Sequence, residues 1–280
     1  MRGWAAAGLL VLSAGLVSAA PPTNPNDLTL SGAMTQGGVA TGVVPFGTVA
    51  LQLGGQPVPV DADRHFLIAF DRDAGPTTIL VARLADGRRV ERALTITPRA
   101  WRIERINAPM RPTKSSEAFL ALRKPELEAI AAARAVRTDA QGWRQAFIWP
   151  RVGRISGLFG SQRVYQGQPG AYHGGVDVAG ATGVPVVAPA QGVVILAATD
   201  KPFTLEGHLL MIDHGHGLSS AFLHLSRIDV KVGQAVAQGQ RIGAVGATGR
   251  ATGPHLHWGM KWNDARIDPI LLVGPMPQGA

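Results

Sequence analysis

The sequence predicts a mainly β protein, with a small β-sandwich-like domain, a short helical linker and a compact antiparallel β domain in the C-terminal part. Three observations support this fold class. The 280 residues include 35 glycines and 20 prolines, which are typical of tight turns. Aromatic residues make up only 6%, so the hydrophobic share of 46% rests on alanine and aliphatic residues. Short apolar runs alternate with glycine-containing turns in two long regions, which one alanine-rich segment separates.

The N-terminus has the features of a secretory signal peptide. Arg2 supplies a positive charge, residues 5–17 form a hydrophobic run, and Val17 and Ala19 suit cleavage after Ala19. The run is too short to favour a membrane span, although an uncleaved anchor is the alternative. We therefore expect a signal peptide over 1–19, a linker over 20–27, and export to the periplasm or cell envelope.

Residues 28–98 predict the small β-sandwich-like domain, of an immunoglobulin-like kind. Strand-like runs flank the turn signals "LGG" and "ADG". His65 is the only histidine of this region, and we expect it at an exposed strand end. The region holds no cluster of catalytic residue types, and its role is left open.

Residues 99–148 predict a partly helical connector. The segment "KPELEAIAAARAVR" places Pro125 in a first helical turn, with Leu127, Ile130 and Ala131 on one side and a solvated polar face opposite. From residue 149 to 272 the pattern is again that of strands broken by glycine, and residues 273–280 form a tail.

Charge and cysteine content limit the function classes. The chain has no cysteine, which excludes disulfides, thiolate zinc sites and cysteine nucleophiles. The net charge of +8 favours polyanions such as nucleic acid, an anionic membrane or an acidic wall polymer. The arginines are scattered rather than clustered, so we expect a basic enzyme with no nucleic-acid partner. No segment after the signal is long and apolar enough to cross a membrane.

Seven of the eight histidines fall between residues 173 and 257, which predicts a metal or catalytic site in the C-terminal region. In "HLH", His255 and His257 share one face of a strand because side chains repeat every two residues. His173 and Asp177 can converge if the chain turns or bulges at the intervening glycines. Neutral imidazole and carboxylate are good zinc ligands, and three protein ligands leave a position for water.

The other polar residues of this region are expected to be structural. His208, His214 and His216 suit hydrogen-bonded surface positions or hairpin tips, because glycines flank the last two. Asp213 and Asp268 stand beside turns and are expected to serve the fold rather than the chemistry.

Five segments carry a family resemblance: "RISGLFGSQR", "HGGVDVAG", "GVPVVAPAQGVV", "FLHLS" and "VGQAVAQGQRIGAVGATGRATGPHLHWGM". In this order they closely resemble the lysostaphin/LytM-type zinc metallopeptidases over residues 149–272. The resemblance implies a mainly antiparallel β domain with an open groove, and one zinc ion held by His173, Asp177 and His257. It also implies that His224 and His255 occupy the two catalytic positions that are not ligands. The substrates of the family are peptide bonds of bacterial peptidoglycan.

Two departures from the family pattern concern specificity more than the metal. Phe222 stands where a tyrosine often precedes the "HLS" histidine, so a hydroxyl at the groove is expected to be missing. His208 stands where many members have a small or polar residue.

The resulting prediction is an exported zinc metalloendopeptidase that hydrolyses peptide cross-links of peptidoglycan through zinc-activated water. Histidine acid/base chemistry is the consistent choice because no HExxH helix occurs. The roles of His224 and His255 stay unassigned individually.

The alternative is a non-catalytic regulator of other cell-wall hydrolases, which the presence of all five positions disfavours. A biotinyl or lipoyl carrier is a third possibility, but Lys231 precedes its glycines instead of occupying a turn. The cross-link cleaved, the oligomeric state and any wall or division-machinery partner are not predicted.

Overall fold

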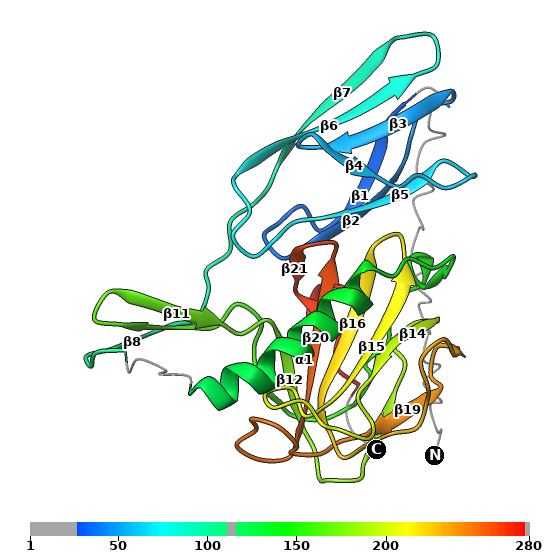
Figure 1. The fold of residues 1–280 in the computed structure, drawn as a ribbon. Helices are drawn as coiled ribbons and strands as arrows, with labels where there is room; N and C mark the ends of the chain where they lie inside the picture. Colours follow the sequence, from blue (N-terminus) through cyan, green and yellow to red (C-terminus); the bar gives the residue numbers. More distant parts are fainter. Residues whose placement is uncertain (1–26, 111–115, 278–280) are drawn as a thin grey trace, which may run out of the picture.

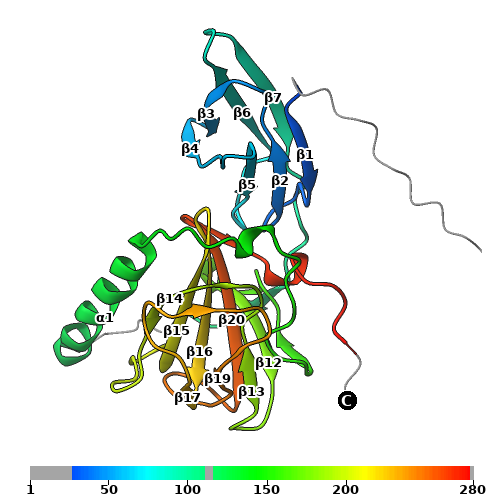
Figure 2. The ribbon, with the colours of Figure 1, turned by 90° about the vertical axis from the view of Figure 1, so that its right-hand side faces the viewer.

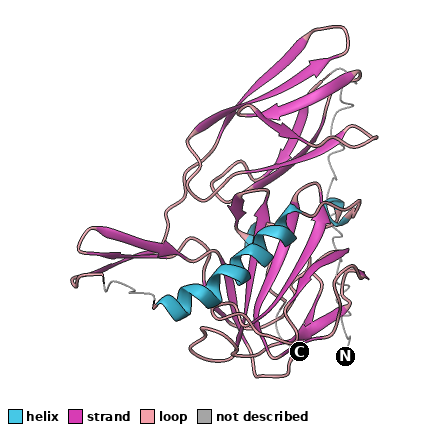
Figure 3. Ribbon diagram, in the orientation of Figure 1, coloured by secondary structure: helices cyan, strands magenta, loops and turns pink. Residues whose placement is uncertain are grey.

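The computed structural model describes residues 27–110 and 116–277 (Figure 1). The predicted signal peptide and all but the last residue of the linker lie outside the described residues. Strands dominate the fold, and the described part of the chain has a single α-helix (Figure 3), so the mainly β prediction is confirmed. No helix in the described ranges combines the length and the apolar character that a membrane span requires.

The N-terminal β unit consists of two antiparallel sheets. One contains three strands, β1 (Thr29–Gly32), β2 (Val39–Val43) and β5 (His65–Ala69). The other contains four strands, β4 (Gln56–Val58), β3 (Thr48–Leu53), β6 (Thr77–Leu84) and β7 (Arg89–Thr95). Phe66 and Leu80 are fully buried in its core, whereas His65 is exposed at the start of β5, as expected.

The C-terminal β unit is built on an eight-stranded sheet with the order β18-β14-β15-β16-β20-β12-β9, and β21 pairs with β20. Its strands are β9 (Ile155–Gly157), β12 (Gly175–Ala179), β14 (Gly192–Ala197), β15 (His208–Gly215), β16 (Leu218–Leu225), β18 (Ala235–Val236), β20 (His255–Trp262) and β21 (Ala265–Ile267). One face of β20 and β16 forms the core, where Trp258 and Phe222 are fully buried. The other face stays available for a site.

Two smaller sheets complete this unit. One contains β13 (Pro185–Val187), β19 (Arg241–Ala244) and β17 (Arg227–Ile228). The other contains β11 (Gln168–Tyr172), β10 (Gln162–Tyr165) and β8 (Ile103–Ile106), with β8 parallel to β10. Short 3-10 helices span Gly142–Arg144 and Pro269–Leu271. Trp149 Nε1 donates to the carbonyl of Gly274 at 2.9 Å, so the start of the expected tail packs on the unit.

Helix α1 (Glu117–Ala135) differs from the predicted connector helix. It begins well before Pro125, because the side chain of Ser116 accepts a hydrogen bond from the backbone of Phe119 and caps the helix there. Pro125 lies inside the helix, so the prediction of a first-turn proline is wrong. Its missing N–H costs one helical hydrogen bond.

The buried side of α1 matches the prediction at Ile130 only. It consists of Arg123, Glu126, Ile130 and Ala133, whereas Leu127 is half exposed and Ala131 is exposed. Arg123 forms ion pairs with Glu126 at 2.7 Å and with Glu206 at 2.6 Å. Glu126 in turn accepts from the backbone and hydroxyl of Thr204, both at 2.7 Å. A polar face is therefore buried because Thr204 and Glu206, in the loop before β15, supply its partners. Figure 2 shows α1 alongside the sheet that contains β14 and β15.

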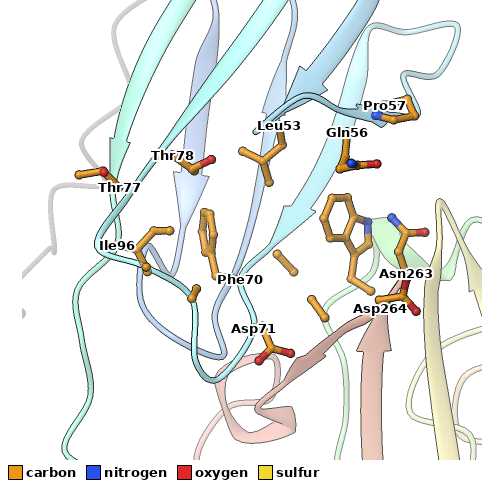
Figure 4. Close-up of a pocket in the computed structure, with 15 residues that line it drawn as sticks. Leu53, Gln56, Pro57, Phe70, Asp71, Thr77, Thr78, Ile96, Asn263 and Asp264 are labelled. Atoms are coloured by element: carbon orange, nitrogen blue, oxygen red, sulfur yellow. The ribbon is translucent and has the colours of Figure 1, made fainter.

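Polar contacts join the two β units. The buried carboxylate of Asp268 accepts from Arg99 at 2.8 Å, and its backbone donates to Gly37 at 2.8 Å. The backbone of Arg266 donates to Asp71 at 2.8 Å. A cavity of about 560 Å³ lies at this junction, where Phe70 and other N-terminal residues face the β20–β21 turn (Figure 4).

A buried hydrogen-bond chain crosses the C-terminal core at His214. Trp258 Nε1 donates to Ser220 Oγ at 3.2 Å, and that hydroxyl pairs with His214 Nε2 at 2.8 Å. His214 Nδ1 lies 2.8 Å from the carbonyl of Gln191, which can only accept, so Nδ1 carries the proton. His214 belongs to β15 and is fully buried rather than at a hairpin tip, because these partners satisfy both ring nitrogens.

The burial of neutral His214 leads us to expect that the free energy of unfolding falls in mild acid. Burial lowers the pKa of His214 to about 4 from its ordinary 6.5, against the opposing effect of the Gln191 carbonyl. The stability that neutral His214 contributes is fully present above pH 6.5 and is lost as the pH falls towards 4. Between these values the histidine of the unfolded chain takes up a proton, whereas the buried histidine of the folded chain does not. We expect a cost of about 2 kcal/mol in the free energy of unfolding by pH 5. Denaturant unfolding at pH 7.5 and 5 measures it, and the pH-dependent loss should shrink by that amount in His214→Gln. An equal loss in both proteins would contradict the assignment.

Candidate metal centre

Strand pairing brings distant residues of the predicted site together. Asp177 on β12 lies opposite His257 on β20, and His255 lies opposite Ala179 in the same register. His173 follows β11 directly, and its backbone is fixed because its N–H donates to Ser161 and its carbonyl accepts from Gly160. The alternation of β20 turns His255 and His257 to one face, as the HxH spacing predicts.

Three side-chain atoms meet at one point. The Nε2 atom of His173 lies 3.0 Å from Oδ1 of Asp177 and 3.0 Å from Nδ1 of His257. The latter two atoms are 2.8 Å apart. The three side chains are only partly exposed, and they form one of two His/Asp groups in the described residues that are close enough to hold a metal ion.

The protonation pattern fits a cation at this point. The carbonyl of Leu158 lies 3.1 Å from Nδ1 of His173, so the proton of the neutral ring is assigned to Nδ1. The lone pair of Nε2 then faces a carboxylate oxygen and a second ring nitrogen. Only a proton or a cation between these atoms removes their repulsion. Two imidazoles and one carboxylate are a ligand set that zinc takes in catalytic sites, so the residues present fit this metal.

The charges and hydrogen bonds around the three side chains favour an ionised Asp177. Burial raises the pKa of Asp177, but hydrogen bonds from His173 and His257 outweigh it and hold the pKa well below its usual range. Burial lowers the pKa of His257, and the hydrogen bond that its ring donates to Asp177 only partly opposes this. Burial also lowers the pKa of His173, but here the hydrogen bond and charge of Asp177 prevail and the pKa is raised. At neutral pH the carboxylate is therefore ionised.

Two glycines make room for these side chains. A Cβ on Gly157 would lie 2.3 Å from Oδ2 of Asp177, and a Cβ on Gly175 would lie 2.8 Å from Nε2 of His257. Gly175 begins β12 with regular pairing, so the expected turn or bulge is absent at Gly175, whereas Gly174 lies outside the strands. Gly175 is needed for close approach instead.

Two further imidazoles face the same point. His224 Nδ1 lies 2.9 Å from the carbonyl of Thr248, and His255 Nδ1 lies 2.8 Å from that of Gly253. Both rings are thereby held with Nδ1 as the donor and Nε2 available. The ring centroids of His224 and His255 are 4.9 Å apart, and Nε2 of His255 is 3.8 Å from Asp177 Oδ1. Burial lowers the pKa of His224 despite the Thr248 bond, which favours its neutral form.

The five histidine and aspartate side chains line a cavity of about 370 Å³. Glu206 and Arg250 line it as well, and sequence reasoning did not identify either residue. The backbone of His224 donates to the Glu206 carbonyl at 2.8 Å, and His224 has a φ of 63°, a conformation that few residues other than glycine adopt. No sequence signal marks a histidine with such a backbone.

The remaining predicted positions lie away from this cavity. His208 donates from Nδ1 to the carbonyl of Ala198 at 2.8 Å, and His216 stacks on Trp143 in the β15–β16 turn. Asp213 accepts from the backbone and hydroxyl of Thr138, in keeping with the structural role expected for it. Phe222 is fully buried opposite Trp258, so the prediction that it removes a hydroxyl from the groove is wrong. Its strand position faces the core.

An antiparallel β unit with a His/Asp metal centre defines a class of metallopeptidase, and comparison with known proteins identifies its family. The model of peptidase family M23 matches residues 171–269. A crystal structure of a family M23 peptidase from Pseudomonas aeruginosa is 31% identical, with a TM-score of 0.64. The likeness covers 87% of this chain and 96% of that one. The chain therefore belongs to peptidase family M23, in agreement with the resemblance seen in its motifs.

Curated relatives match a segment of about a hundred residues. The peptidoglycan DD-endopeptidase ShyA of Vibrio cholerae is 43% identical over 106 residues, which are 38% of this chain and 24% of that protein. The DD-carboxypeptidase/endopeptidase Mpg of Neisseria meningitidis is 37% identical over 106 residues, again 38% of this chain and 24% of that protein. The matched segment thus spans about a quarter of the length of these relatives.

Proposed function

We propose that this protein is an exported zinc metalloendopeptidase that hydrolyses peptide cross-links of bacterial peptidoglycan. The observation that carries the proposal is the convergence of His173, Asp177 and His257 beside two further imidazoles with available Nε2 atoms. The relatives named for endopeptidase activity on peptidoglycan support the substrate class. The N-terminal sequence pattern supports export to the periplasm or envelope.

In this proposal His173, Asp177 and His257 hold one zinc ion. When bound, zinc polarises the scissile carbonyl and supplies an activated water. Asp177 contributes the negative charge of the ligand set, and Leu158 fixes the His173 ring so that Nε2 faces the metal position. Gly157 and Gly175 keep the space in which the carboxylate and the His257 ring lie.

The two other histidines carry the proton transfers. One Nε2 accepts a proton from the attacking water, and an imidazole then delivers a proton to the nitrogen of the leaving amine as the C–N bond breaks. The carbonyls of Thr248 and Gly253 hold the rings in orientation throughout. The protonated imidazole also stabilises the negative charge that develops on the carbonyl oxygen. The low pKa of His224 suits it to start as a neutral base.

Hydrolysis of defined muropeptides tests this function. We expect the zinc-loaded full chain to cleave cross-linked dimers, to leave them intact after chelation, and to regain activity when zinc is added back. Product masses identify the bond that is cut. Retention of zinc without cleavage of any cross-linked peptide would instead support a non-catalytic regulator of other wall hydrolases.

A further inference from the structure

The groove continues past the metal centre into a second cavity of about 220 Å³. His257, Leu223 and Glu206 line both cavities, so the two adjoin along the same strands. Alternate residues of β20 form the floor, running from His257 through Gly259 to Lys261. Helix α1 forms one wall, and the segment around Tyr172 forms the other.

Three cations gather in this second cavity: Arg134 from α1, Lys261 from β20 and Arg266 from β21. We call them the basic cluster. Lys261 lies directly opposite Arg266 in the β20–β21 pairing. Like charges at directly opposite positions of an antiparallel pair are destabilising. Arg134 in the last turn of α1 brings a third positive charge to the same place.

The acidic residues nearby do not neutralise the basic cluster. Glu206 is the only carboxylate lining the cavity, and Arg123 already holds both of its oxygens at 2.6 Å. Asp264 is fully exposed and lies 3.7 Å from Lys261. Asp71 accepts the backbone N–H of Arg266 instead of its guanidinium. Within the described residues, no carboxylate pairs with the guanidinium of Arg134 or Arg266.

Arg134 is the member of the basic cluster that most clearly lacks a hydrogen-bond acceptor. Its Nε is buried and has no hydrogen-bond partner. The helix dipole favours a cation in the last turn of α1, but that effect does not require a buried donor without a partner. Burial lowers the pKa of Arg134, and the charge of Arg266 lowers it further. Burial and the charges of Arg134 and Arg266 likewise lower the pKa of Lys261, so the three side chains repel one another.

We propose that the basic cluster is a subsite that binds a free carboxylate of the peptide substrate. This rests on the proposed peptidase function, whose metal centre lies at the other end of the same groove. Lys261 is four residues from His257 on β20, about 13 Å along the strand. An extended peptide covers that distance with about four residues, and with fewer when a side chain carries the carboxylate. Guanidinium and ammonium groups bind carboxylates through charge-assisted hydrogen bonds.

Binding of two synthetic cross-linked stem peptides tests the subsite. The peptides are identical except that the carboxylates of one are free and those of the other are amidated. Zinc-loaded full-length His255→Ala is used as the parent, so that turnover is slow compared with the binding measurement. We expect the parent to bind the acid peptide about tenfold to a hundredfold more tightly, as charge-assisted bonds allow. Adding Lys261→Met or Arg266→Gln should remove about tenfold of this preference and leave the amide affinity unchanged.

Lys231→Met is the matched control because it removes an exposed lysine that lines neither cavity. It should keep the full preference for the acid peptide. Equal binding of both peptides by the parent, binding of neither, or equal losses in Lys261→Met and Lys231→Met would overturn the subsite. Hydrolysis by the unsubstituted protein is measured in parallel. A chain that cleaves neither peptide but retains the binding difference would refute the proposed function and leave the subsite standing.

Discussion

Replacing Asp177 or His257 by alanine is expected to remove bound zinc and to lower hydrolysis of cross-linked peptides at least about a thousandfold. Asp177 supplies the one negative charge among the three converging atoms, and His257 is the partner 2.8 Å away. Loss of either side chain leaves only two of the three protein ligands, so zinc is no longer held. Metal analysis of the purified full chain and muropeptide hydrolysis measure the two effects separately.

Asp86→Ala is the control for this pair of variants. Asp86 is an exposed carboxylate in the turn between β6 and β7, outside both His/Asp groups that are close enough to hold a metal ion. It should retain zinc and activity. A far-ultraviolet circular dichroism spectrum unchanged from the parent would show that Asp177→Ala and His257→Ala still fold. Full zinc content in either alanine variant would refute the ligand assignment.

The site was accessible to sequence reasoning because its residues lie in short motifs with defined geometry. The HxH spacing places His255 and His257 on one face of a strand, and β20 shows this alternation. The position of Asp177 opposite His257 depends on strand pairing over eighty residues, which only the family resemblance implied. Local spacing therefore proposes candidates, and the register of the sheet decides which of them meet.

Helix α1 shows what the sequence did not reveal. The usual rule turns apolar residues inward, which selected Leu127 and Ala131. The helix instead buries Arg123 and Glu126, because Thr204 and Glu206 satisfy them from a loop about eighty residues away. A charged residue looks solvated until such a partner is known. The same contacts hold the helix that carries Arg134 against the groove. The sequence therefore did not reveal this groove wall either, because its partners lie in a distant loop.

The N-terminal unit contacts the segment that carries His173. Arg72 donates to the Gly160 carbonyl at 3.0 Å and lies over the ring of Tyr172 at 4.7 Å. Gly160 in turn donates to the carbonyl of His173 at 2.9 Å. Two residues thus connect the N-terminal sheets to a candidate ligand. This geometry favours a bracing role for a region whose own residues gave no functional signal.

Replacing His255 by alanine is expected to lower kcat by about a hundredfold to ten-thousandfold while most of the zinc stays bound. The Nε2 of His255 is 3.8 Å from Asp177 Oδ1, outside the group of three atoms within 3.0 Å of one another. His224 should behave in the same way, but its φ of 63° requires a residue that tolerates this conformation. Asparagine does so more readily than alanine, so His224→Asn is the better variant.

The comparison of zinc content with turnover separates these histidines from the ligands. Both rings are held by backbone carbonyls rather than by the converging atoms, so their removal leaves His173, Asp177 and His257 in place. We expect zinc content near that of the parent in His255→Ala and His224→Asn, with muropeptide cleavage strongly reduced in both. If zinc fell as far as in Asp177→Ala, these histidines would belong to the metal-binding set. If kcat stayed within a few-fold of the parent, proton transfer would have to run through another group lining the cavity, and Glu206 and Arg250 would be the next side chains to replace.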